Sequence, residues 1–345
     1  MNINEICKEI PKVELHFHLT GAIPIPAFWK LVQKYDNYET IQSIDDLEKK
    51  FQYRDFIHFL QVWRWKNQFI REYDDFEFVA KEVSLDLQKQ NITYVEAFVS
   101  ASDFINNFQL ELPEIYYSIR KGLNSVSGTK VNIIGDLVRN YGPEEGNKQL
   151  EEIKELKHLG VLGIGIGGSE REYPPEIFRK VYEKARKYGL KTTAHAGEVV
   201  GPENIWSAIK SLKVDRIGHA TSIIQDVELI KFVKDHEIPL ELCPGSNVKT
   251  GSIRNIGDHP IKTLFDQGLL ISVNTDDPHM FQTTMEEEFM TLYSQFGFNI
   301  QEIYDISKRA IASSWTQDAE KEVLLSKLNN FAQNISENLN QSSKI

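Results

Sequence analysis

The chain is organised around the segment Thr192-Thr193-Ala194-His195-Ala196-Gly197-Glu198, in which a short β-like run enters a glycine turn. The imidazole of His195 can bind a metal ion, and the carboxyl group of Glu198 can move a proton. Hydrolysis of an unactivated bond needs both abilities. We therefore expect a buried strand that ends at these two residues, with partners supplied by the rest of the chain.

Short apolar or β-branched runs recur along the chain, and most are separated by stretches whose apolar residues repeat every three or four positions. Including the first segment there are eight such runs, at Lys12 to His18, Thr93 to Val99, Lys130 to Val138, Val161 to Ile166, Lys191 to His195, Asp215 to His219, Ile238 to Cys243 and Leu269 to Thr275. Eight strands followed by helices predict an α/β fold, a (β/α)8 TIM barrel whose functional residues lie at the carboxyl ends of the strands. We expect residues 1–345 to form one such barrel domain.

Two regions depart from this alternation. The first connection, about residues 19–92, is far longer than a βα unit needs and contains aromatic residues such as Phe51, Tyr53, Phe59 and Trp63. We expect a helical insertion after the first strand, with a small core of its own and a part that overhangs the pocket as a lid. The polar tail, residues 329–345, is expected to fray.

Composition narrows the classes of partner. The net charge of −11 would repel phosphate backbones and anionic lipid, so we expect neither nucleic acid nor a membrane surface as a partner. No apolar run approaches the roughly 18 residues of a membrane span. Cys7 and Cys243 lie far apart and form no disulfide framework or metal-spaced pair. These features predict a cytoplasmic protein.

The segment Glu14-Leu15-His16-Phe17-His18 offers two further histidines. Side chains at positions i and i+2 of a strand share a face, so the two imidazoles point the same way and can hold one metal ion. An isolated His-x-His is more often a satisfied core or surface pair than a metal site. Its place at a strand end followed by Gly21 favours the metal site here.

Two more strand ends carry polar residues. One is Gly218-His219-Ala220, and the other is Asn274-Thr275-Asp276-Asp277-Pro278. Adjacent aspartates before proline usually form a turn or helix cap, but here they point to opposite sides, so one could bind a metal while the other faces a substrate. Three histidines and one aspartate gathered at the strand ends would suit Zn²⁺, with Fe²⁺ or Mn²⁺ as alternatives.

The run Gly163-Ile164-Gly165-Ile166-Gly167-Gly168 matches the dinucleotide-binding pattern G-x-G-x-x-G. That pattern must open a helix, whereas Pro174 and Pro175 intervene here before the next helix. We interpret the glycines as a strand end without side chains, where backbone N–H groups can approach a flat ligand.

Taken together, these motifs resemble the adenosine deaminase family of metal-dependent hydrolases. The matching segments occur in the family's order and span residues 12–278: Glu14-Leu15-His16-Phe17-His18-Leu19, Gly167-Gly168, His195-Ala196-Gly197-Glu198, Arg216-Ile217-Gly218-His219 and Asn274-Thr275-Asp276-Asp277-Pro278. The resemblance implies a barrel that binds one Zn²⁺ per chain and deaminates a small purine, most simply adenosine or deoxyadenosine, with release of ammonia.

The resemblance also implies roles for individual residues. The metal ligands would be His16, His18, His195 and Asp276. Glu198 would protonate the purine nitrogen N1, and His219 would orient the attacking water and take its proton. Asp277 would hydrogen-bond N7, and the Gly168 amide would meet N3.

Two departures from the family pattern keep the exact substrate open. An acidic residue that contacts the ribose usually follows the first two histidines, and here it is Thr20; His18 and Thr20 are the remaining candidates for substrate binding on this side. The second strand usually ends with Arg and Pro, where this chain has Phe98 and Ala101. Adenine or an N6-substituted purine is therefore an alternative substrate.

Two other functions are less favoured. A two-metal barrel hydrolase would usually have a bridging Lys at the end of the fourth strand, where this chain has Gly167-Gly168-Ser169-Glu170. A non-catalytic purine-binding protein would not need every group that the chemistry requires.

Overall fold

Eight parallel strands form the centre of the molecule in the computed structural model, which describes residues 2–36 and 41–342. They are hydrogen-bonded in sequence order: β1 (Lys12–His18), β2 (Ile92–Val99), β3 (Lys130–Val138), β4 (Val161–Gly167), β5 (Lys191–Ala196), β6 (Arg216–His219), β7 (Leu240–Leu242) and β8 (Ile271–Val273). The barrel closes just beyond β8, where the His18 N–H donates to the Asp276 carbonyl at 2.8 Å and the Asp276 N–H donates to the His16 carbonyl at 3.2 Å. The predicted TIM barrel is confirmed.

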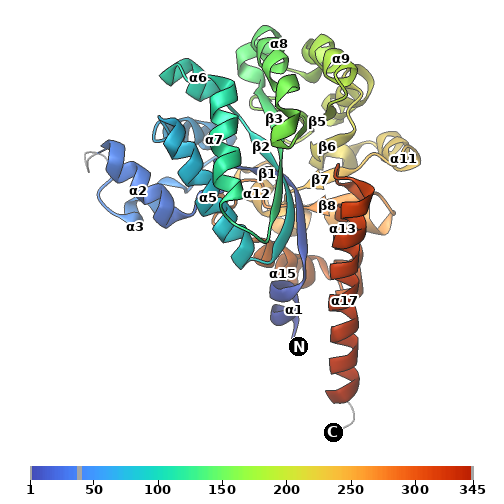
Figure 1. The fold of residues 1–345 in the computed structure, drawn as a ribbon. Helices are drawn as coiled ribbons and strands as arrows, with labels where there is room; N and C mark the ends of the chain where they lie inside the picture. The colour runs from blue at the N-terminus through green and yellow to red at the C-terminus, as the bar shows by residue number, and fades with distance from the viewer. Residues whose placement is uncertain (1, 37–40, 343–345) are drawn as a thin grey trace.

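Helices cover the outside of the barrel, as Figure 1 shows. They follow the strands as α6 (Ser102–Phe108), α7 (Leu112–Asn124), α8 (Gly142–Ile153), α9 (Arg179–Lys187), α10 (Pro202–Ser207), α11 (Val227–Asp235), α12 (Pro244–Lys249), α13 (Ile261–Asp266), α14 (Pro278–Phe281), α15 (Met285–Phe296) and α16 (Ile300–Ser313). Each long helix buries one face; α7, for example, buries Ile115, Ile119 and Leu123. β1 is buried along its whole length and β2 at all but one position, as expected for strands of a sheet that is covered on both faces.

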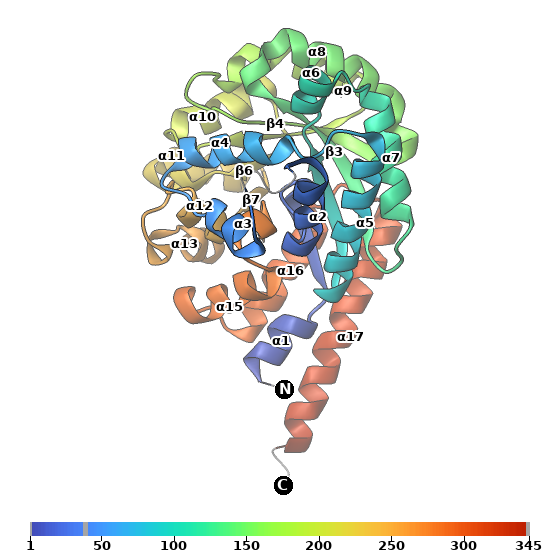
Figure 2. The same ribbon diagram turned by 90° about the vertical axis from the view of Figure 1, so that its left-hand side faces the viewer.

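The long first connection is helical, as predicted. It contains α2 (Ile25–Asp36), α3 (Ile44–Lys50), α4 (Phe56–Asn67) and α5 (Tyr73–Lys89), while α1 (Ile3–Glu9) precedes β1. The insertion has an aromatic core in which the Phe28 ring lies 5.9 Å from Phe51 and 5.7 Å from Phe69. Asp55 caps the start of α4 by accepting from the His58 N–H at 2.8 Å. Figure 2 shows α4 crossing in front of the barrel.

The carboxyl-terminal region differs from our expectation. Residues after 328 were expected to fray, but α17 (Asp318–Ser342) extends to residue 342, the last that the structure describes (Figure 1). Leu324, Leu328 and Ile335 are buried, and their spacing of four and seven places them on one face of the helix. These three buried apolar residues on one face therefore stabilise the helix despite the polar composition of this region. Over residues 2–36 and 41–342, no helix combines the length and apolar character needed to cross a membrane.

Candidate active site and metal centre

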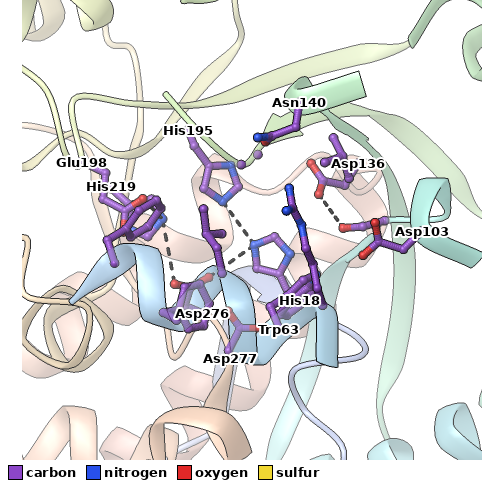
Figure 3. Close-up of a pocket in the computed structure, with 18 residues that line it drawn as sticks. His18, Trp63, Asp103, Asp136, Asn140, His195, Glu198, His219, Asp276 and Asp277 are labelled. Atoms are coloured by element: carbon purple, nitrogen blue, oxygen red, sulfur yellow. Dashed lines mark hydrogen bonds and ion pairs between the residues drawn. The ribbon is translucent and has the colours of Figure 1, made fainter. Parts of the chain in front are cut away.

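Four side chains from three places in the barrel converge at the carboxyl ends of the strands. β1 contributes His16 and His18, β5 contributes His195, and Asp276 follows β8. The Nε2 atom of His195 lies 3.0 Å from Nε2 of His16 and 3.2 Å from Nε2 of His18. The Oδ1 atom of Asp276 lies 3.4 Å from Nε2 of His16. It lies 3.3 Å from Nε2 of His18, a contact that Figure 3 shows. All four side chains are buried.

This cluster has the dimensions of a tetrahedral zinc site. Ligand atoms about 2.0–2.1 Å from Zn²⁺ lie roughly 3.4 Å from each other in a tetrahedron. The observed separations of 3.0 to 3.4 Å are close to that edge length. In addition, Oδ1 of Asp276 is buried without a hydrogen-bond partner among the described residues, as expected for an atom whose partner is a cation. The residues therefore fit a bound zinc ion.

A second set of four residues, His16, His219, Cys243 and Asp276, also lies close enough together to be considered. Burial raises the pKa of the Cys243 thiol well above its ordinary value, so the thiolate that metals prefer is disfavoured. His18 and His195 also line the pocket, whereas Cys243 does not. The set with three histidines therefore fits a metal ion better than the set with Cys243.

Hydrogen bonds behind the ligands fix two of the imidazoles. Nδ1 of His16 lies 2.8 Å from Oε2 of Glu241, whose Oε1 accepts from Nε of Arg216 at 2.6 Å. Nδ1 of His195 lies 2.9 Å from the carbonyl oxygen of Ile166. Since an acceptor faces each Nδ1, the proton of the neutral ring is placed there, which leaves Nε2 free to bind the metal.

Glu198 lies beside the cluster in a loop that a second carboxylate organises. Oε2 of Glu170 accepts from the N–H of Glu198 at 3.1 Å and of Val199 at 3.2 Å, and Oε1 accepts from the N–H of Gly197. Burial, followed by the charges of Asp276 and Glu170, raises the pKa of Glu198 well above its ordinary value. Burial therefore favours the protonated form of Glu198, which is the form that a proton donor requires.

The imidazole of His219, at the end of β6, lies near the carboxyl groups of Glu198 and Asp276. Its Nε2 atom lies 3.7 Å from Oε2 of Glu198 and 3.9 Å from Oδ2 of Asp276, while Asn247 contacts its Nδ1 at 3.1 Å. Burial lowers the pKa of His219 to about 3, so the imidazole is neutral. The φ angles of His219 and Asp276 are 60° and 66°, in the left-handed region, and such strain is common where function fixes a side chain.

A pocket of about 680 Å³, part of it open to solvent, covers these groups. Helix α4 supplies an apolar lid, comprising Phe56, Phe59, Leu60 and Trp63, together with Arg64 at the edge. Part of the insertion thus lines the site. A concave pocket with an apolar lid and a few convergent polar groups is typical of a small-molecule site.

Three of the four residues predicted to bind substrate line the pocket, and the fourth does not. His18, Gly168 and Asp277 line the pocket. Burial, with the charge of Asp276 second, raises the pKa of Asp277 well above its ordinary value, so this carboxyl group can donate a hydrogen bond. Thr20 is only 4% exposed and is not among the lining residues, and its carbonyl accepts from Lys66 Nζ at 2.6 Å.

The glycine run is a strand, as interpreted from the sequence. It forms β4 and its exit, and Gly168 has a φ angle of +100° that favours glycine. A Cβ atom at Gly168 would clash with the side chain of Asn140, and one at Gly165 would lie 2.6 Å from Cε1 of Phe98. The glycines therefore make room for neighbouring side chains at the base of the pocket.

Several lining residues were not predicted from the sequence. They include Ser100 and Asp103 after β2, Asp136 within β3 and Asn140 after it. Position at a strand end is the signal that could have identified them, since the same rule identified the histidines. Without a second chemical group beside them in sequence, each was indistinguishable from a turn or cap residue.

The sequence matches the family model described as "Adenosine deaminase" over residues 11–331. It is 32% identical over 323 residues to an adenosine deaminase of Clostridium kluyveri, covering 91% of this chain and 92% of the relative. An adenine deaminase of Marinomonas sp. is 29% identical over 328 residues, with 94% and 97% covered. An aminodeoxyfutalosine deaminase of Streptomyces avermitilis is 28% identical over 326 residues, with 93% and 91% covered.

Solved structures agree with the fold. An adenine deaminase from Arthrobacter aurescens superposes with a TM-score of 0.89 at 24% identity, covering 94% of this chain and 99% of that one. An amidohydrolase from B. ambifaria, described with bound Zn, has a TM-score of 0.88 at 26% identity, covering 97% and 94%. Family, barrel and ligand cluster agree, and the chain belongs to the adenosine deaminase family of hydrolytic deaminases.

Proposed function

We propose that this protein uses one Zn²⁺ to remove the amino group of an aminopurine by hydrolysis, with release of ammonia. The observation that carries the proposal is the convergence of His16, His18, His195 and Asp276 beside a carboxyl group held in its protonated form. Adenosine and deoxyadenosine are the substrates that the sequence resemblance favours. The relatives named adenosine deaminase and adenine deaminase act on purines that share an amino group at C6.

When bound, zinc would act as a Lewis acid that makes water nucleophilic near neutral pH. The protein's own groups then have distinct tasks around the purine. Glu198 holds a proton for N1, so that electron density can leave C6 as water attacks. His219, neutral and within 4 Å of both Glu198 and Asp276, orients the water and accepts its proton.

The remaining contacts hold the ring flat over the metal centre. Asp277, protonated through burial, donates to N7, while the backbone N–H of Gly168 donates to N3. The apolar lid of α4 excludes bulk water, which strengthens each of these interactions.

The test measures bound metal and ammonia release on the same purified samples, with adenine, adenosine, deoxyadenosine, N6-methyladenine and AMP as substrates. Glu198→Gln preserves size but cannot deliver a proton, so it should keep zinc and lose about 10²- to 10⁴-fold in kcat. His195→Ala should lose both zinc and turnover. Glu203→Gln, at an exposed position on α10, is the matched control and should resemble the parent protein.

Full activity of Glu198→Gln would refute the proton-donor role. Failure of the zinc-loaded parent to release ammonia from any of the five compounds would refute the proposed function. In that case, zinc and purine binding without turnover would identify a non-catalytic purine-binding protein.

A further inference from the structure

Asp136 lines the pocket, and one oxygen of its carboxylate accepts no hydrogen bond from the described residues. The side chain is 3% exposed, and its Oδ2 accepts from the Ser100 hydroxyl at 2.6 Å. Its Oδ1 is buried and has no hydrogen-bond partner among the described residues. The neighbouring Asp103 differs, because its two oxygens accept from the Tyr141 hydroxyl at 2.7 Å and from the Asn67 amide at 2.8 Å.

An unsatisfied buried acceptor is costly, and more so when it is charged. The cost is tolerated where a ligand completes the site. Asp136 lines the same pocket as Glu198, Gly168 and Asp277. The substrate is therefore expected to bring a hydrogen-bond donor to Oδ1 of Asp136.

The order of the strands indicates which part of a purine faces Asp136. In the proposed function N1 meets Glu198 after β5, N3 meets Gly168 after β4, and N7 meets Asp277 after β8. Around the purine, the atoms between N3 and N7 on the side away from N1 are C4, N9 and C8. Around the barrel, the strands between β4 and β8 on the side away from β5 are β3, β2 and β1. N9 therefore faces β3 and β2.

The close-up of the pocket agrees with this order. Glu198 and His219 lie on one side of His195, whereas Asp136 and Asp103 lie on the other (Figure 3). Of the two aspartates, only Asp136 has a free oxygen among its described contacts. The group at N9 of the substrate is thus the one that Asp136 would contact.

We propose that Asp136, held by Ser100, accepts a hydrogen bond from N9–H, and that the preferred substrate is a free 6-aminopurine base rather than its N9-riboside. In a nucleoside N9 bears the sugar carbon and no hydrogen, so Oδ1 would lose the N9–H donor. Thr20, which stands where the family usually has its ribose-binding acid, does not line the pocket. This inference rests on the proposed function, because it uses the same orientation of the purine.

The first test varies the substrate and leaves the protein unchanged. Ammonia release by the zinc-loaded full chain is measured with adenine, 9-methyladenine and adenosine. A site that hydrogen-bonds a substrate N–H rejects analogues without it by about 10⁴-fold in kcat/KM. Since 9-methyladenine adds only one methyl group, a comparable rejection of it and of adenosine separates loss of the N–H from exclusion of the sugar by the lid.

The second test varies the acceptor. Asp136→Ala should lower kcat/KM for adenine by about 10- to 100-fold and leave 9-methyladenine and adenosine unchanged or improved. Asp103→Ala is the matched control, and it should change all three substrates by the same factor because both of its oxygens are already engaged. Zinc content and thermal melting confirm that each variant is folded, and Asp136→Asn replaces any Asp136→Ala protein that is not.

A preference for adenine of less than about 10²-fold over 9-methyladenine would overturn the inference. So would a folded Asp136→Ala protein that keeps the parent's preference. If adenosine is the better substrate in the parent, the inference fails while aminopurine deamination stands. If no aminopurine yields ammonia, the proposed function itself fails.

Discussion

Replacing Glu241 with Gln should weaken zinc binding without touching a metal ligand. Glu241 stands behind His16, with 2.8 Å between its Oε2 and the ligand's Nδ1, and its other oxygen accepts from Arg216 at 2.6 Å. All three side chains are fully buried. The carboxylate accepts from both neighbours, but an amide has only one acceptor, so its NH₂ group must face one of two donors.

The magnitude follows from the two ways in which the amide can be oriented. If its oxygen faces Arg216, its NH₂ opposes the proton on Nδ1 of His16 and disfavours the ring orientation that binds metal. If its oxygen faces His16, a neutral acceptor replaces a carboxylate and the ligand becomes less basic. Loss of such an outer partner typically costs about 10- to 100-fold in metal affinity, or about 1.4–2.8 kcal/mol.

Competition with a chromophoric chelator measures the zinc Kd of the parent, of Glu241→Gln and of the exposed Glu237→Gln control. We expect weaker binding only for Glu241→Gln, with kcat per bound zinc changed less than the affinity. A Kd within twofold of the parent's would refute the assignment of Glu241 as the residue that orients His16.

Two further predictions concern pH and packing. Because burial raises the pKa of Glu198, its proton is present at low and neutral pH and lost as pH rises, so kcat/KM should fall on the alkaline side; the residual activity of Glu198→Gln should lack this fall, and a shared alkaline limb would contradict the reasoning. Gly165→Ala places Cβ 2.6 Å from Cε1 of Phe98 and should destabilise the protein by about 1–3 kcal/mol, seen as a lower Tm. Gly257→Ala, with no neighbouring atom within 4 Å, is its control, and an equal Tm for the two variants would disprove the clash.

The strand pattern could be predicted because burial and periodicity act locally. β1 and β3 begin and end at the expected residues, and β2, β4 and β5 each differ from the expected bounds by one residue at one end. The last two are shorter than the apolar runs that predicted them: the run 238–243 forms β7 only over Leu240–Leu242, and the run 269–275 forms β8 over Ile271–Val273. Hydrogen-bonded pairing with both neighbours sets these limits, and the sequence of one strand does not contain that information.

The metal centre was more predictable than the substrate pocket. The proposed ligands are chemically distinctive and stand at strand ends, which the barrel brings together whatever the loops do. Asp136 and Thr20 show the limit of this reasoning. Both lie at or near strand ends, but Asp136 lines the pocket and Thr20 does not. Their side-chain directions depend on contacts across the barrel and with α4, such as the one from Lys66 to the Thr20 carbonyl at 2.6 Å.

Phe98 shows how one departure from the family pattern fits the rest of the barrel. Its ring centroid lies 4.8 Å from that of His16 and 4.9 Å from that of His18, so it packs against two of the proposed metal ligands. That position is available only because Gly165 has no side chain. The aromatic ring and the glycine therefore depend on each other, because a side chain at position 165 would displace the Phe98 ring from its contacts with His16 and His18.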